Sequence, residues 1–205
     1  MIRLGQLLRR AYVRPRDIPI WKHDMMVSMV ANFINCRQHL DFLKTNDGQI
    51  PPKVLADQLN YISRFNLDLD EHWPEICKHV KVIIEDYGRL VIPDFSRIIR
   101  SVAELGETNQ EFWDLIEAKL VKDNLVRYLS ESEAAKIMWG LCKVGKGSDE
   151  LWKKLEKEVA NHYLALEKED LAEAIYALEV SGKGDKNVIF KLKSRMKATE
   201  LALVN

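Results

Sequence analysis

The sequence has few cysteines: Cys36, Cys77 and Cys142 are the only ones among 205 residues. Their number is odd, their spacing is long and no C-x-x-C pair occurs. The sequence therefore indicates neither a disulfide framework nor a zinc site. Because Cys142 lies in an apolar helical stretch, we expect it to be a small core residue.

Long hydrophobic runs and strand-like alternation are lacking as well. The longest apolar run, from Met25 to Ile34, is interrupted by Ser28 and Asn32. It is far shorter than the ~20 residues that a helix needs to span a bilayer, so we expect no transmembrane segment. Because apolar and polar residues do not alternate over any length, the sequence predicts an all-α fold. A chain of this length fits one domain with a substantial core.

A net charge is also lacking, since 31 basic residues balance 31 acidic ones. Residues 1–20 differ, because they carry five arginines and one acid, Asp17. Arginines interleaved with apolar residues are typical of a mitochondrial targeting segment, and we expect a location in the matrix or on the matrix side of the inner membrane. The alternative is a basic arm, residues 1–22, that contacts a partner. Its contact residues would be Arg3, Arg9, Arg10, Arg14 and Arg16.

Residues 139–152, WGLCKVGKGSDELW, come close to the phosphate-binding pattern G-x-x-x-x-G-K-[ST]. That pattern needs a hydroxyl directly after the lysine to hold Mg²⁺, but Gly147 takes this place and Ser148 comes one residue late. It also needs a strand before the loop, whereas the apolar residues of 130–144 have helical spacing. We therefore predict a helix, a glycine stop and a second helix, with no nucleotide bound.

The same stretch recurs along the chain. Gly182-Lys183-Gly184 copies residues 145–147 at an offset of 37, and the apolar pattern extends backwards at offsets of 39 and 40. We therefore predict an α-solenoid of about four stacked helix-turn-helix units, residues 51–88, 91–128, 129–165 and 166–203, within a repeat region 51–205. Equivalent buried positions in successive first helices are predicted at Leu59, Ile99, Met138 and Ile175.

Each predicted unit has a first helix, a stop and a second helix. The stops fall near Asn66, Gly106, Gly145 and Gly182, because Gly and Asn tolerate the left-handed conformation at a helix end. The second helix carries a tryptophan in three units, and we expect these to pack in the core: Trp73, Trp113 and Trp152. Residues 23–46 read as a helical cap, which would pack on the first unit through Met26, Val30 and Phe33.

No catalytic or metal-binding set is recognisable. His72 and His79 are two helical turns apart, and we expect them to be a surface or groove feature. The carboxylates cluster at the predicted helix starts, where capping and the helix dipole account for them. We therefore predict that the chain is not an enzyme and uses no cofactor, metal or small-molecule substrate.

Two of the units, LSESEAAKIMWGLCKVGKGSDELWKKLEKEV and LEKEDLAEAIYALEVSGKGDKNVIFKLKSRM, resemble the organellar helical repeats of the octotricopeptide and FAST-kinase-like (heptatricopeptide) group. The segments IMWGLCKVG and AIYALEVSG match the core of that repeat. The resemblance covers the four units. It implies an α-solenoid without catalysis and, for many members, work on organelle RNA.

Two functions remain open. The first is a non-catalytic scaffold, an accessory subunit of a large mitochondrial assembly such as a respiratory complex, an ATP synthase or a ribosome. The second is an RNA-binding module in organelle RNA processing, stability or translation, which rests on the resemblance and on a basic stretch over residues 183–197. We expect the lysines at the turns to be free to meet a partner's carboxylates or phosphates. The candidate contacts are Lys146, Lys183, Lys186, Lys193 and Lys197.

Overall fold

The computed structural model describes residues 34–46, 50–65, 69, 71–85 and 91–204 of the chain. Within these ranges every regular element is a helix, which confirms the predicted all-α class. None of the described helices combines the length and the hydrophobicity that crossing a membrane requires. The chain divides into two compact units between Phe42 and Leu43, and the architecture below is that of the larger one, residues 43–205. Residues 34–45 are helical, whereas residues 1–33, and with them the first part of the predicted cap with Met26, Val30 and Phe33, lie outside the described ranges.

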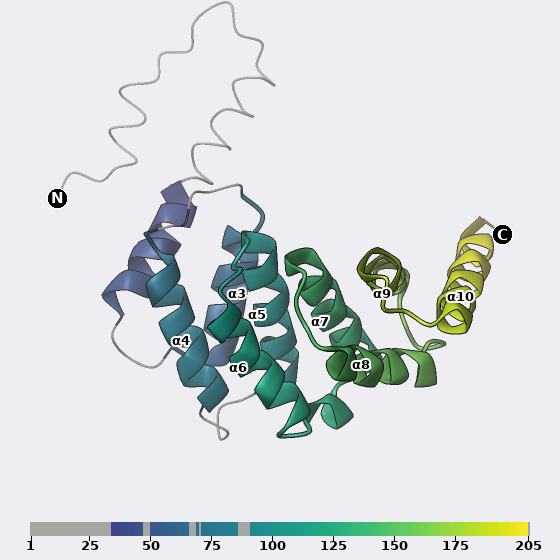
Figure 1. The fold of residues 1–205 in the computed structure, drawn as a ribbon. Helices are drawn as coiled ribbons and strands as arrows, with labels where there is room; N and C mark the ends of the chain where they lie inside the picture. Colours follow the sequence, from purple (N-terminus) through teal and green to yellow (C-terminus); the bar gives the residue numbers. More distant parts are fainter. Residues whose placement is uncertain (1–33, 47–49, 66–68, 70, 86–90, 205) are drawn as a thin grey trace, which may run out of the picture. The chain divides into compact units, whose positions relative to one another are not determined.

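The larger unit is a series of helices that pack in two rows (Figure 1). The first helices, α3, α5, α7 and α9, pack against one another in chain order, and the second helices, α4, α6, α8 and α10, do the same. Each helix pair lies in one predicted unit, except that α10 runs one residue further. The elements are α3 (Pro52–Ile62), α4 (Trp73–Glu85), α5 (Ile92–Leu105), α6 (Gln110–Val121), η1 (Leu125–Tyr128), α7 (Glu131–Val144), α8 (Asp149–Asn161), α9 (Lys168–Ser181) and α10 (Lys186–Val204).

The first helices begin where the sequence supplies a suitable first turn. Proline stands in the first turn of α3 and α5, where its missing N–H is no loss. Helix α7 begins with a capping box, in which the Ser130 hydroxyl accepts from the Glu133 N–H at 3.3 Å. The Glu133 carboxylate accepts in return from the Ser130 N–H at 2.7 Å. These two bonds satisfy N–H groups that the helix itself leaves unpaired, so this start is specified locally.

Glycine ends three of the four first helices. Gly106, Gly145 and Gly182 adopt φ values of 93°, 67° and 67°, the left-handed conformation that other residues rarely adopt. This confirms the predicted stops at these positions. Helix α3 is different, because it already ends at Ile62 and Ser63 is its C-cap. The predicted stop at Asn66 lies outside the described residues.

The core follows the predicted register. Leu59, Ile99, Met138 and Ile175 lie in successive first helices and are at most 7% exposed, as predicted. Gly140 lies where α5 and α7 approach closely. A Cβ there would stand 3.3 Å from the Cβ of Ala103, so the glycine permits this close packing.

Two of the three tryptophans link a turn to the helix that follows it through a hydrogen bond. Trp113 and Trp152 are buried, and each indole N–H donates to the carbonyl of the residue after a glycine stop. The Nε1–O distances are 2.8 Å to Glu107 and 3.2 Å to Lys146. Packing in the core is therefore confirmed for both. Trp73 is only half-buried, so there the prediction was too strong.

Three local features differ from the sequence analysis. His79 was expected in a groove or at the surface, but it is buried and its Nε2 lies 2.9 Å from the Leu43 carbonyl oxygen, a hydrogen bond that offsets the burial of the ring. Cys142 was expected in the core and is half-buried. The short helix η1 between α6 and α7 was not predicted. It follows Asn124, whose φ of 56° a non-glycine residue seldom adopts.

Candidate functional site

Residues 139–152, which resemble a phosphate-binding loop, form the end of α7, a turn and the start of α8. A helix precedes the turn instead of a strand, as predicted. Ser148 caps α8, because its hydroxyl accepts from the Leu151 N–H at 3.3 Å. The hydroxyl that would have served Mg²⁺ in a phosphate loop is thus used by the helix itself.

The two lysines at the turns lie where the sequence placed them, but they are not free. The Lys146 ammonium donates to the Gln110 side-chain oxygen at 2.6 Å. Lys183 lies 3.1 Å from the Asp149 carboxylate and donates to the Gly147 carbonyl at 2.8 Å. Both side chains therefore already have partners within the chain, and their contact with another molecule stays a prediction. Each lysine joins its own helix pair to the preceding one.

The other predicted contact lysines, Lys186, Lys193 and Lys197, lie on α10. Lys193 pairs with Glu179 at 2.5 Å. Lys186 and Lys197 are exposed on α10 and have no partner among the described residues. The predicted contact arginines, all within residues 1–22, lie outside the described ranges. Lys186, Lys193 and Lys197 share one face of α10 by their helical spacing, whereas Lys146 and Lys183 lie at the turns.

A second repeated contact joins the second helices, and the sequence analysis missed it. Glu117 of α6 accepts from the Ser148 N–H at 3.1 Å. At the equivalent position of the next pair, Glu156 of α8 accepts from the Asp185 N–H at 2.6 Å. Each carboxylate thus lies at the N-terminus of the next second helix, where the dipole favours negative charge. The signal was present, because Glu156 follows Glu117 at the offset of 39 and Asp185 follows Ser148 at the offset of 37.

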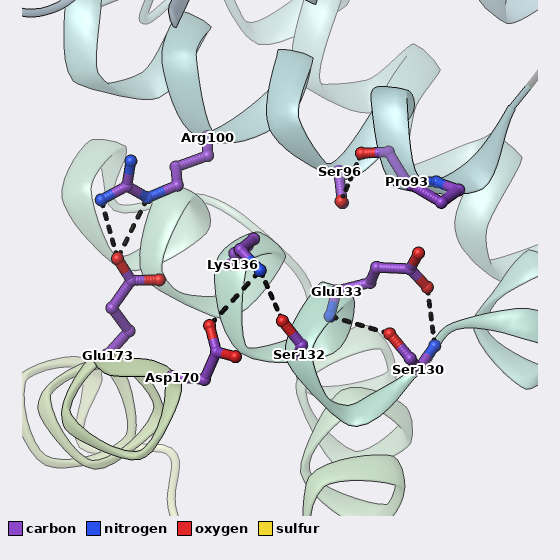
Figure 2. Close-up of polar contacts among 9 residues, drawn as sticks. All are labelled: Pro93, Ser96, Arg100, Ser130, Ser132, Glu133, Lys136, Asp170 and Glu173. Carbon is purple, nitrogen blue, oxygen red and sulfur yellow. Dashed lines mark hydrogen bonds and ion pairs between the residues drawn. The ribbon is translucent and has the colours of Figure 1, made fainter. Parts of the chain in front are cut away.

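A network of polar side chains lies on the first helices, and we call it the first-helix face. It comprises Arg97 and Arg100 of α5, Lys136 of α7, and Asp170 and Glu173 of α9, most of which Figure 2 shows. Arg100 of α5 reaches across α7 and donates through Nη2 and Nε to one oxygen of Glu173 on α9, at 2.7 and 3.1 Å. Lys136 of α7 lies 3.3 Å from the Asp170 carboxylate of α9. The face therefore connects three first helices through side chains.

The cations of the first-helix face are matched by acids. Arg97 pairs with Asp57 of α3 and lies 3.5 Å from Asp94. Arg100 has a second carboxylate, Glu104, at 3.8 Å. Pairs that are this exposed contribute only about 0–1 kcal/mol each to stability, so their main effect is to neutralise the surface. Next to them, a shallow pocket of about 400 Å³ lies between α5 and α7 and is lined mainly by serines and these same cations.

Aromatic and apolar side chains lie beside this paired network. The Arg100 guanidinium lies 4.8 Å from the centre of the Trp139 ring, and the Lys143 ammonium lies 6.0 Å from it. Tyr176 and Val180, one turn apart on α9, are 49% and 59% exposed. Trp, Tyr and Arg are the residue types enriched in the contacts that dominate protein–protein binding energy.

Two observations on the described residues concern metal binding and cysteine reactivity. Among them, no group of three or more His, Cys, Asp or Glu side chains is arranged to hold a metal ion. Cys77 lies in a small pocket where its thiol donates to Glu107 at 3.1 Å. Burial, together with this carboxylate, raises the pKa of Cys77 to about 12, so the group stays a thiol rather than the nucleophilic thiolate.

Comparison of the sequence with protein-family models and with curated proteins gives no match.

Proposed function

We propose that the chain is a non-catalytic helical-repeat scaffold, an α-solenoid of four helix pairs that binds other proteins as an accessory subunit of a large mitochondrial assembly. The two rows of helices, which pack in chain order, support the repeat architecture. The recurrent glycine stops and the lysine and glutamate contacts between neighbouring pairs support it further. The resemblance to organellar helical repeats agrees with this proposal.

The observation that carries the proposal is the charge balance of the first-helix face. A phosphate backbone is bound mainly through unpaired lysines and arginines, which release counterions. On this face Arg97, Arg100 and Lys136 each have a carboxylate partner within 4.0 Å. Phosphates would have to displace those carboxylates, whereas a protein surface can dock beside the existing pairs. The face therefore favours a protein partner.

Affinity purification of the tagged full-length chain from mitochondria tests the scaffold. We expect the same set of proteins in fixed proportion, both with and without ribonuclease and also after a moderate salt wash. The reason is that contacts between largely neutral surfaces depend little on counterion release. Recovery of mainly RNA, lost on the salt wash, would contradict the proposal.

Location is tested separately through the arginines of the N-terminal segment. We expect the full chain fused to a fluorescent protein to enter mitochondria. Replacement of Arg3, Arg9 and Arg10 by Gln should abolish this, because import segments require positive charge. The matched control replaces three lysines of α10, Lys186, Lys191 and Lys197, by Gln. Import of the arginine variant at the level of the control would contradict the proposed location.

RNA binding is the second candidate function, and the exposed lysines of α10 are the observation that favours it. Lys186, Lys191 and Lys197 are exposed there, with no partner among the described residues. If α10 contacts RNA, replacement of these three lysines by Gln should weaken binding to a single-stranded oligonucleotide and reduce its salt dependence. Equal binding by the variant and the wild type would remove this candidate.

A further inference from the structure

Two register positions on the first-helix face can be compared across all four helix pairs. At one position, the side chain changes from Asn60 to Arg100, Trp139 and Tyr176 along the chain. At the position four residues later, the chain has Arg64, in the turn after α3, and then Glu104, Lys143 and Val180 within α5, α7 and α9. All eight side chains are at least partly exposed, so the helix packing does not demand an apolar residue at either position.

The earlier helix pairs therefore show which residues the packing tolerates at these positions in the later pairs. Polar residues fill both positions in α5, and Asn60 fills the first position in α3, where the first helices pack in the same way. In the last two pairs three of the four residues are large and apolar: Trp139, which is half-buried, and Tyr176 and Val180, which are exposed. A large exposed apolar residue that the fold does not need is an indication of a binding surface. We call these three residues, with Lys143, the α7–α9 patch.

Charge indicates the kind of partner. Lys143 is exposed, has no carboxylate partner among the described residues, and its ammonium lies 6.0 Å from the centre of the Trp139 ring. Arg100, which borders the patch, is already shared between Glu104 and Glu173. The unbalanced charge at the patch is thus a single positive one, next to apolar side chains. A partner that fits would present apolar groups and one carboxylate at helical spacing.

We propose that the α7–α9 patch docks an acidic amphipathic segment of a partner protein. Apolar side chains of that segment cover Trp139, Tyr176 and Val180, and a carboxylate pairs with Lys143. This inference rests on the proposed scaffold function and names the surface it uses. Tryptophan, tyrosine and arginine are the residue types that most often carry the energy of such contacts, and Arg100 already holds the indole in place.

Selection of peptides from a phage-displayed random library, with peptides long enough for about four helical turns, tests the chemistry of the partner. The immobilised bait is the full-length chain. We expect the enriched peptides to combine leucine or aromatic residues at helical spacing with Asp or Glu. Synthetic copies should bind the wild type with micromolar Kd. Enrichment of basic peptides, or no enrichment, would overturn the proposal.

Substitutions then locate the contact. Tyr176→Arg and Val180→Lys place at these positions the residue that an earlier pair carries there, Arg100 and Lys143 respectively, so the fold is expected to tolerate both. Lys143→Glu reverses the one unpaired charge. Each variant should weaken the selected peptides at least about tenfold. The matched control is Phe190→Lys on α10, an exposed apolar residue outside the patch, which should change the Kd less than about twofold.

The outcomes separate this inference from the proposed function. If Phe190→Lys weakens binding while the three patch variants do not, the chain binds protein segments but the α7–α9 patch is not the site. If the purified chain carries RNA and the peptides fail to bind, both the function and the patch are wrong. A last experiment replaces the Glu or Asp of a selected peptide by Lys. We expect this peptide to bind Lys143→Glu more tightly than it binds the wild type. If it still binds the wild type more tightly, the proposed pairing of Lys143 with a carboxylate is wrong.

Discussion

Gly145 ends α7 with a backbone φ of +67° and a ψ of +35°. A Cβ added there would meet no atom within 4 Å, so only the backbone conformation requires glycine. An L-residue in this conformation costs about 1–2 kcal/mol, and Asn costs less because its side chain bonds locally. We expect Gly145→Ala to lower the free energy of unfolding by about 1 kcal/mol and Gly145→Asn to lower it by less.

Urea denaturation followed by circular dichroism measures both variants. The control is Gly184→Ala, at a glycine without a positive φ, where the Cβ would lie 2.7 Å from the Leu178 Cβ. This variant should be destabilised by crowding, and an Asn there should be worse than Ala. The opposite order of Ala and Asn at the two glycines thus separates strain from crowding. Equal effects of Ala and Asn at Gly145 would refute the role given to its φ.

Cys77 provides a prediction on pH. Burial and the hydrogen bond to Glu107 raise its pKa to about 12, three pKa units above the ordinary value of 9.0. In mildly alkaline buffer we expect its alkylation by iodoacetamide to be at least about tenfold slower than that of a free cysteine, because the thiolate is the reactive form. Glu107→Gln removes a negative charge that opposes the thiolate, so the pKa should fall and the rate should rise.

The pH dependence of the alkylation rate, measured in a Cys36→Ala, Cys142→Ala background, checks this expectation. The matched control is Glu111→Gln, because Glu111 lines the same pocket without contacting the thiol. It should leave the profile almost unchanged. A Glu107→Gln profile that coincides with the wild-type profile would show that burial alone sets the pKa.

At the residue scale, the sequence allowed positions to be predicted better than contacts. A glycine stop is set locally by the backbone φ that it requires, and a buried apolar position is set by helical spacing. The stops at Gly106, Gly145 and Gly182 were accordingly predicted correctly. The side-chain partner of Lys146 is 36 residues away, and nothing local selects it. Burial of His79 likewise depends on a distant carbonyl, that of Leu43. Contacts of this kind need the arrangement of neighbouring helices.

Among the elements, the two turn lysines join consecutive helix pairs. Lys183 pairs with Asp149, a side chain that is 83% exposed, and Lys146 bonds the amide of Gln110. Such exposed contacts contribute little, because water and salt screen them. We expect the double variant Lys146→Ala, Lys183→Ala to keep its helical content and to lose no more than about 1 kcal/mol of stability.

Titration calorimetry with ATP or GTP and Mg²⁺ tests the same lysines as nucleotide ligands. We expect no saturable heat with either the wild type or the double variant. The reason is that Ser148 caps α8 and Lys183 is occupied by Asp149 and the Gly147 carbonyl. Micromolar binding that disappears in the double variant would restore the phosphate-loop interpretation.

The contacts between elements repeat because the register repeats. Glu117 and Glu156 accept from the backbone N–H at the start of the next second helix, as their shared offset implies. The sequence analysis found the offset but assigned the charged residues only to helix starts within a pair. The first-helix face was missed for a related reason. Arg100 and Glu173 are 73 residues apart, and only the packing of α5, α7 and α9 brings them together.

For the larger unit as a whole, stability is expected to vary along the rows of helices. When each pair contacts only its neighbours, an end pair has one interface where an inner pair has two. Helix α7 packs against both α5 and α9. Helix α10 packs against α8 and α9 at the end of its row, and Leu192 is its only buried residue among those described. Local opening should therefore be easiest at α10.

Native-state hydrogen exchange followed by mass spectrometry measures this gradient. We expect peptides from α7 to exchange most slowly and those from α10 to exchange fastest of the described helices.

Leu192→Ala and Leu155→Ala form a matched pair, because the two leucines occupy equivalent positions in α10 and α8, and each is fully buried. A buried Leu→Ala change costs about 2–5 kcal/mol in either helix. The first should raise exchange mainly in α9 and α10, and less in α8, because α10 contacts α9 and α8. The second should raise it from α6 through α10, since α8 contacts α6, α7 and α10. Exchange that rises uniformly over the whole unit in both variants would mean that the helices open as one cooperative block, and the nearest-neighbour account would then be wrong.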